Sequence, residues 1–212
     1  MIPKIIHQLW IGPRPAPLEL MKTWQTKHPD WEYIFWDETR LEAEFPEGLR
    51  NQAQYDEMPE LNGKCDIARL EILNRFGGVF IDADSRCLRP LEDFLLETEA
   101  FSCYENEINR RGLIACGVMG SVPDSEFTSV LIGEIAEKSG NRLWKGPKSA
   151  WKTVGPGLVT DTVRKYSMTS LTVYPSHYFI PSHHTGSVYK GKGIVFAEHY
   201  WGSTPNSGYE YE

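Results

Sequence analysis

Residues 62–84 read NGKCDIARLEILNRFGGVFIDAD, a helical pattern followed directly by a strand pattern. Apolar side chains recur at helical spacing through residues 62–76, and the two glycines that follow supply a stop. Residues 79–81 are β-branched or aromatic, which is typical of a buried strand. This stretch therefore predicts a helix that leads into a short strand, with Asp82 and Asp84 at the strand's end.

Predicted strands and helices alternate through the rest of the chain. Strand patterns cover residues 4–11, 31–36, 171–174 and 193–197, and helical patterns cover residues 18–27, 124–139 and 158–166. This alternation predicts an α/β fold with a central mixed, mostly parallel sheet flanked by helices. The length of 212 residues suits one compact domain, which we place at residues 1–203, and residues 204–212 are expected to form a flexible C-terminal tail.

Composition argues against several classes of partner. The net charge is −7 and no long run of Lys or Arg is present, so neither nucleic acid nor an anionic membrane surface is an expected partner. No apolar run approaches the ~20 residues that span a bilayer, and no signal peptide is visible. Four cysteines show no metal-ligand spacing, so they are expected to be thiols in a reducing compartment, and a cytoplasmic location is expected.

Asp82 and Asp84 form a carboxylate pair where ligands of open α/β sheets commonly bind. Two carboxylates at such spacing on an extended segment point to the same side and repel unless a cation lies beside them. Hard oxygen ligands suit Mg²⁺ or Mn²⁺, which often complete their coordination with substrate phosphates. In an acidic protein, this ion would supply the positive charge that a pyrophosphate needs. The alternative is a pair of solvated loop carboxylates.

Three further residues are candidates for the same site. Asp66 and Arg69 lie three residues apart on one helix, so they form either a helical ion pair or a pair that binds a ligand's hydroxyls and phosphate. His199 follows a predicted strand and is either a structural histidine or a metal ligand, with the adjacent pair at 183–184 as its rival. Only neutral imidazole coordinates, so metal affinity should fall as pH drops through ~6.5.

Five segments in order resemble glycosyltransferase family 32, the DXD-containing sugar transferases. They are residues 2–12 (IPKIIHQLWIG), 28–37 with HPDWEY and a later Trp-Asp, 65–84 with CDIAR and FGGVFIDAD, 153–158 (TVGPGL) and 199–203 (HYWGS). The first-strand, Asp/Arg and DXD segments are also distantly similar to the catalytic domain of large clostridial glucosylating toxins. Two positions depart from the family pattern, since Cys65 replaces a common Ser and Thr204 replaces a common Trp.

The resemblance implies a GT-A fold with a Rossmann-like nucleotide-binding half, and it implies a role for each matching residue. Asp66 and Arg69 would hold the donor sugar, and Asp84 would bind the metal directly and serve the reaction. The other residues that it assigns to nucleotide, donor or metal binding are Leu9, Trp10, Ile11, Asp82, Ala83, Trp201 and Ser203 for the donor, and Asp82, Asp84 and His199 for the metal.

The implied activity is metal-dependent transfer of a sugar from a nucleotide-sugar donor to a glycan or another hydroxyl acceptor, with retention at the anomeric carbon. A UDP-sugar is favoured over a GDP-sugar, and Mn²⁺ or Mg²⁺ is the expected cofactor. Two alternatives remain open from the residues. One is an aspartate-nucleophile phosphatase that uses Asp82, although that class places its motif on the first strand. The other is a non-catalytic, lectin-like or degenerate transferase domain.

Overall fold

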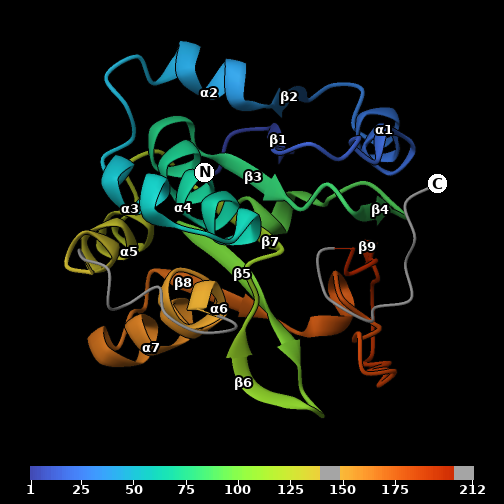
Figure 1. Cartoon of the computed structure of the whole chain (residues 1–212). Coiled ribbons are helices and arrows are strands. Elements are labelled where there is room, and N and C mark those ends of the chain that lie inside the picture. The colour runs from blue at the N-terminus through green and yellow to red at the C-terminus, as the bar shows by residue number, and fades with distance from the viewer. Residues whose placement is uncertain (139–148, 203–212) are drawn as a thin grey trace.

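The computed structural model describes residues 1–138 and 149–202 (Figure 1). In these residues, helices pack against a central sheet, which confirms the α/β class. The strands of this sheet are β1 (Ile5–Leu9), β2 (Glu32–Trp36), β3 (Gly78–Ile81), β5 (Ala100–Asn106), β6 (Arg110–Ile114), β7 (Val118–Ser121) and β8 (Leu171–Tyr174). A separate two-stranded ladder joins β4 (Ser85–Cys87) to β9 (Ala197–His199).

The sheet runs in the order β2-β1-β3-β7-β5-β6, and β8 pairs with the first half of β5. Strand pairs β1–β2, β1–β3 and β5–β8 are parallel, whereas β3–β7, β5–β7 and β5–β6 are antiparallel. The mixed sheet is as expected, but its pairs are evenly divided rather than mostly parallel. After β3, the strands β5, β6 and β7 pair with one another or with β3 in antiparallel fashion. The pattern of apolar residues in the sequence does not show the direction in which a strand pairs.

The helices and 3₁₀ turns of the described chain are α1 (Leu18–Lys27), α2 (Glu38–Glu44), α3 (Gln52–Glu57), α4 (Leu61–Phe76), η1 (Asp93–Leu95), α5 (Glu126–Ala136), α6 (Ser149–Thr153), α7 (Pro156–Tyr166) and η2 (Ser176–Tyr178). None of these helices is long and apolar enough to cross a membrane. The predicted α4 and α5 are confirmed, and the Ser125 hydroxyl caps α5 by accepting from the Thr128 amide.

Two apolar cores lie on opposite faces of the sheet, as the alternation along β3 shows. Phe80 belongs to the core beneath α4, whereas Val79 and Ile81 belong to the core formed with Trp24 and the C-terminal segment. Every residue of β3 is buried, since both faces are covered. The site at the end of β3 therefore rests on a strand fixed from both sides.

The turn from α4 into β3 depends on two glycines in the left-handed region. Gly77 and Gly78 have φ values of 64° and 92°. A Cβ added to Gly78 would lie 2.8 Å from the Ile5 carbonyl oxygen. His7 on β1 bonds the Gly77 carbonyl through Nε2 at 2.8 Å while its Nδ1 accepts from the Trp36 indole, and burial lowers the pKa of His7 to about 4. A neutral imidazole thus secures the turn that delivers Asp82.

Two local expectations were wrong. The late strand lies at β9 rather than at residues 193–197, because its partner is β4 at the site and not the central sheet. Residues 144–157 are rich in Gly, Pro and Lys, a composition that favours a loop, yet their described part contains α6 and the start of α7, whose Pro156 occupies a first-turn position that needs no backbone donor. The expected tail, residues 204–212, and the domain limit at 203 lie outside the described residues.

Candidate active site

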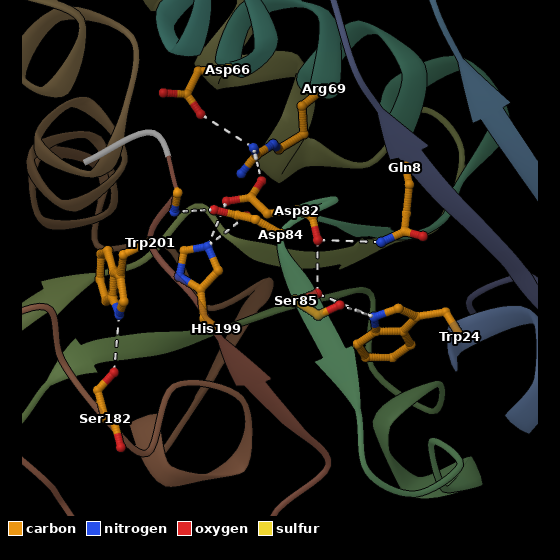
Figure 2. Close-up of polar contacts among 11 residues, drawn as sticks. Gln8, Trp24, Asp66, Arg69, Asp82, Asp84, Ser85, Ser182, His199 and Trp201 are labelled. Atoms are coloured by element: carbon orange, nitrogen blue, oxygen red, sulfur yellow. Dashed lines mark hydrogen bonds and ion pairs between the residues drawn. The ribbon is translucent and has the colours of Figure 1, made fainter. Parts of the chain in front are cut away.

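Three side chains with metal-ligating atoms converge at the end of β3 (Figure 2). Asp82 and Asp84 follow β3 directly, and His199 is the last residue of β9. The β4–β9 ladder pairs His199 with Ser85, the residue after Asp84. The ligand atoms of the three side chains lie within 4.8 Å of one another. This ladder is what brings a histidine from 115 positions further along the chain to the paired carboxylates.

Hydrogen bonds fix the orientation of these ligands. His199 Nε2 lies 3.0 Å from Asp84 Oδ1 and 3.5 Å from Asp82 Oδ2. The Gly202 amide donates to the second oxygen of Asp84 at 2.7 Å. His199 Nδ1 is buried without a hydrogen-bond partner in the described part of the chain. Two carboxylates and an imidazole converging in this way are a donor set that fits Mn²⁺, which accepts both oxygen and imidazole ligands.

Charge coupling inside the cluster shifts the pKa values of its members. Burial alone would lower the pKa of His199, but the Asp84 and Asp82 carboxylates raise it from 6.5 to about 10. Burial likewise works against ionisation of Asp84, yet the His199 charge and hydrogen bonds from His199 and the Gly202 amide hold its pKa below 3.8. In the metal-free protein at neutral pH, His199 is therefore an imidazolium paired with two carboxylates.

Mn²⁺ binding is accordingly expected to release a proton from His199 at neutral pH. Between pH 6.5 and about 10, the affinity for Mn²⁺ should rise by up to about tenfold per pH unit, because the metal competes with that proton. This window lies higher than the ~6.5 expected for a free imidazole. Calorimetry at pH 7.5 in two buffers of different ionisation enthalpy should report about one proton released per bound ion.

A His199→Gln protein should bind Mn²⁺ more weakly and lose this buffer dependence, whereas His184→Gln should retain it. Identical heats of Mn²⁺ binding in both buffers for the parent protein would show that the ion does not displace a proton from His199.

The charge on His199 also affects folding stability in the metal-free protein. The stability that this charge contributes is fully present below pH 6.5 and is lost as pH rises through about 10.

Arg69 links the α4 helix to the carboxylate cluster. Its Nη2 donates to Asp82 Oδ1 at 2.5 Å and lies 3.5 Å from Asp66 Oδ1 (Figure 2). The guanidinium also covers the Phe80 ring at 4.8 Å. Burial would lower the pKa of Arg69, but the Asp82 and Asp66 charges outweigh it, so the guanidinium stays charged. Arg69 therefore forms the helical ion pair with Asp66 and also binds Asp82 of the carboxylate cluster, so a structural role does not exclude a role in ligand binding.

Two nitrogens of Arg69 have no partner among the described residues. Nε and Nη1 are buried and unpaired, and an unsatisfied buried donor is costly unless a ligand completes it. Burial raises the pKa of the neighbouring Asp66 from 3.8 to about 7, although Arg69 opposes this shift. Asp66 is thus able to hold a proton near neutral pH, and the pair offers both donors and an acceptor to a ligand.

The backbone of Asp82 is held by three residues that the sequence analysis did not single out. Gln8 Nε2 donates to the Asp82 carbonyl at 3.3 Å and Ser85 Oγ donates to it at 2.7 Å. The Asp82 amide donates to the Gly117 carbonyl at 2.9 Å, and a Cβ on Gly117 would lie 3.1 Å from Asp82 Oδ2. One signal was available, because Gln8 and His7 are polar residues inside a strand that is otherwise apolar and buried. The Ser85 contact is a local one, three residues along the chain, whereas the Gly117 contact depends on long-range pairing that no spacing reveals.

The residues at positions 9–11, which the resemblance assigns to donor binding, divide between core and surface. Leu9 and Ile11 are buried in the core cluster beneath α4. Trp10 points to the other side, is half-buried, and donates from its indole nitrogen to the Arg14 carbonyl at 2.7 Å. Of these three residues, Trp10 alone offers a ring surface to a ligand. Ala83, between the two aspartates, is 3% exposed, so its side chain serves packing.

Trp201 closes one side of the cluster. Its ring centroid lies 4.7 Å from that of His199, and its indole nitrogen donates to the Ser182 carbonyl (Figure 2). Adjacent histidines in a loop usually point apart, but the rings of His183 and His184 both pack on Trp201, and their centroids lie 4.2 Å from each other. His183 bonds to the buried Glu105, so this pair braces Trp201 instead of joining the ligand cluster. Ser203 lies outside the described residues.

A mixed α/β sheet with convergent carboxylates at the end of an inner strand is the architecture of nucleotide-sugar-binding glycosyltransferases of the GT-A fold. Residues 17–102 match the family described as "Glycosyltransferase sugar-binding region containing DXD motif". The match supports the resemblance of this part of the chain to the DXD-containing glycosyltransferase family 32. The matched region contains Asp66, Arg69, Asp82 and Asp84, so the family and the geometry point to the same residues.

Sequence relatives include yeast and viral proteins. Mannosyl phosphorylinositol ceramide synthase CSH1 of Saccharomyces cerevisiae is 30% identical over 186 residues, which cover 81% of this chain and 45% of the relative. A glycosyltransferase named L373 from Acanthamoeba polyphaga mimivirus is 27% identical over 81% of this chain and 68% of the relative. The chain spans about half the length of the Saccharomyces relatives that it matches, 45% of one and 51% of another.

Solved structures support the fold. The PaToxG glycosyltransferase has a TM-score of 0.62 at 14% identity and covers 78% of this chain and 70% of that chain. The galactosyltransferase LgtC, solved with donor and acceptor sugar analogues, has a TM-score of 0.56 at 16% identity over 93% of this chain and 87% of that one. At such identities the likeness establishes the GT-A fold, as the resemblance implied.

Proposed function

We propose that this chain transfers a sugar from a nucleotide-diphosphate sugar to a hydroxyl acceptor, with a divalent cation held by Asp82, Asp84 and His199. The convergence of these ligand atoms within 4.8 Å, at the end of an inner strand, carries the proposal. The three side chains leave part of a roughly six-coordinate shell free, and diphosphate oxygens are suitable for the remainder. The imidazole favours Mn²⁺ over Mg²⁺.

The described residues divide the work of the reaction. When bound, the cation would neutralise the charge that develops on the departing diphosphate. Arg69 keeps Asp82 in place and directs its two unpaired nitrogens to the donor, and Asp66 accepts from the donor sugar's hydroxyls. Trp201 covers the His199 ring and limits access of water to the ligands. We expect the transfer to retain the anomeric configuration, as the family resemblance implies.

The donor and acceptor are further parts of the proposal. We favour a UDP-sugar, as the first-strand resemblance to the toxin catalytic domains suggests, with a neighbouring toxin domain solved in its UDP-bound form. The relatives named as mannosyltransferases make a mannose donor the alternative. The acceptor is a hydroxyl of a glycan or of another sugar-bearing molecule, and those relatives are named for inositol phosphoceramide.

Donor hydrolysis tests this proposal directly. The parent protein is incubated with UDP-hexoses or GDP-mannose, with Mn²⁺ or with EDTA, and release of the nucleoside diphosphate is measured. One donor should be hydrolysed slowly and only with metal, while p-nitrophenyl phosphate is left intact. Hydrolysis of the simple phosphate ester would favour an aspartate-nucleophile phosphatase. Failure to hydrolyse any donor, together with sugar binding, would favour a lectin-like domain.

We further propose that Trp10 packs on the donor's base. Nucleotide binding should then change tryptophan fluorescence in the parent, and Trp10→Phe should lose most of that change because the half-exposed Trp10 ring directly follows β1. Trp31→Phe provides the matched control, since Trp31 packs against the core that contains Trp24. A Trp10→Phe protein with the full change would show that another tryptophan reports binding.

A further inference from the structure

A second hollow, of about 340 Å³, lies between β6 and the α6–α7 helices and contains none of the carboxylate ligands. Its lining combines one large aromatic side chain with more cations than anions. The lining residues are Arg111, Leu113, Trp151, Lys152, Gly157, Thr160, Asp161 and Arg164. Three of these carry positive charge and one carries negative charge, which is a local reversal in a chain whose net charge is −7.

The cations of this hollow are available to a ligand. Arg111 and Lys152 are exposed and form no ion pair with a described residue. Arg164 donates from Nη2 to the Gly112 carbonyl at 3.2 Å, which holds its guanidinium at the mouth of the hollow. Trp151 is half-buried and the Arg110 guanidinium lies over its ring, 6.0 Å from the centroid, so a ligand would meet the part of the ring that Arg110 leaves uncovered. Flat rings cover the apolar faces of sugars, and a guanidinium binds carboxylate or phosphate oxygens through paired donors.

Both walls of the hollow continue to the proposed transfer site. Along the first wall, Leu113 precedes Gly117 by four residues, and Gly117 packs against Asp82. Four extended residues span at most about 14 Å. Along the second wall, Gly157 lines the hollow, and two residues earlier a Cβ on Gly155 would lie 2.8 Å from Asp66 Oδ2. The hollow and the carboxylate cluster are therefore separated by no more than a span that a short saccharide can bridge.

We propose that this hollow binds the acceptor, and that the acceptor is a saccharide bearing an anionic group, a phosphate or a carboxylate, close to the sugar hydroxyl that is glycosylated. This inference rests on the proposed transferase function and adds the chemical class of the acceptor. Arg111, Lys152 and Arg164 bind the anionic group, and Trp151 packs on the sugar ring. The balance of charge in the hollow disfavours a neutral sugar as the principal ligand.

Binding measured without donor tests the site independently of transfer. Calorimetry or ligand-observed NMR with the parent protein compares glucose 6-phosphate, glucuronate, glucose and inorganic phosphate. At least one anionic sugar should bind about tenfold more tightly than glucose and than phosphate alone. Whichever of glucose 6-phosphate and glucuronate binds more tightly identifies the anionic group as a phosphate or a carboxylate. Equal binding of glucose, or equal binding of inorganic phosphate, overturns the proposal.

Variants locate the site. Arg111→Gln and Lys152→Gln should each weaken the preferred sugar about tenfold, the cost of one charge-assisted contact, whereas Lys22→Gln on α1 makes the same charge change without effect. With donor present, Arg111→Gln should reduce glycosylation of that sugar about tenfold and leave donor hydrolysis unchanged. Unchanged binding in both pocket variants overturns the assignment. Absence of donor hydrolysis in the parent refutes the transferase proposal alone, since the binding comparison does not depend on it.

Discussion

Replacing Asp84 with alanine is expected to abolish Mn²⁺-dependent binding of a nucleoside diphosphate. Asp84 supplies one oxygen to His199 and the other to the Gly202 amide, so its loss removes a ligand and also releases the segment that carries His199. Loss of an outer-shell partner alone typically costs about 10–100-fold in metal affinity or activity, and loss of a direct ligand should exceed the upper end of that range. Calorimetry with UDP and Mn²⁺ provides the measurement.

Two further variants separate the ligand role from folding. Asp84→Asn keeps the size of the side chain and an oxygen that can accept from the Gly202 amide, yet it lacks the negative charge, so it should fold normally and still lose metal-dependent binding. Asp161→Ala, which removes a carboxylate from outside the cluster, should bind nucleotide like the parent. Unchanged Mn²⁺-dependent binding in both Asp84 variants would refute the central assignment.

Replacing Arg69 with methionine should lower the free energy of unfolding by roughly 3–5 kcal/mol, the usual cost of removing one partner of a buried ion pair. The variant leaves Asp66 and Asp82 close together without their shared cation. Denaturant unfolding measures the loss. Arg40→Met serves as the control, because Arg40 and Glu44 form a more exposed pair at 3.8 Å, whose loss should cost less than about 1 kcal/mol.

The pH dependence of this loss tests its cause. In the parent, burial raises the pKa of Asp66 to about 7, so the folded state holds a proton that the unfolded state loses near pH 4. Removal of Arg69, which opposes that shift, should raise the pKa of Asp66 further. The variant's stability should therefore fall as pH rises from 5 to 8, since the folded state binds more protons than the unfolded state. A loss that is equal at both pH values would indicate a packing defect instead.

Local patterns were sufficient for the elements nearest the site. The α4 helix, the glycine turn and β3 follow from residues adjacent in the chain, because helical periodicity, a left-handed glycine turn and β-branched side chains are local properties. The carboxylates at the end of β3 follow from the same stretch. The α/β class and the family resemblance also follow from the ordered segments, and the match over residues 17–102 supports that resemblance.

Long-range pairing decided what the sequence left open. His199 was already a candidate metal ligand, but only the β4–β9 register, which places it opposite Ser85, brings it to the carboxylates. The roles of Gln8 and Gly117 at Asp82 likewise depend on which strands are neighbours, as does the even division of parallel and antiparallel pairs. Strand order and register depend on contacts between residues far apart in the chain, and no single segment encodes them.

The sequence by itself determined the α/β class, the carboxylate pair and the helix that carries Asp66 and Arg69. Tertiary structure decided that Arg69 binds Asp82, that the His199 proton is held up to a pKa of about 10, and that a cationic hollow lies beside the site. The physical reason is that charge coupling and burial fall off over a few ångströms in space. Such distances are set by the packing of strands and helices, whatever their separation along the chain.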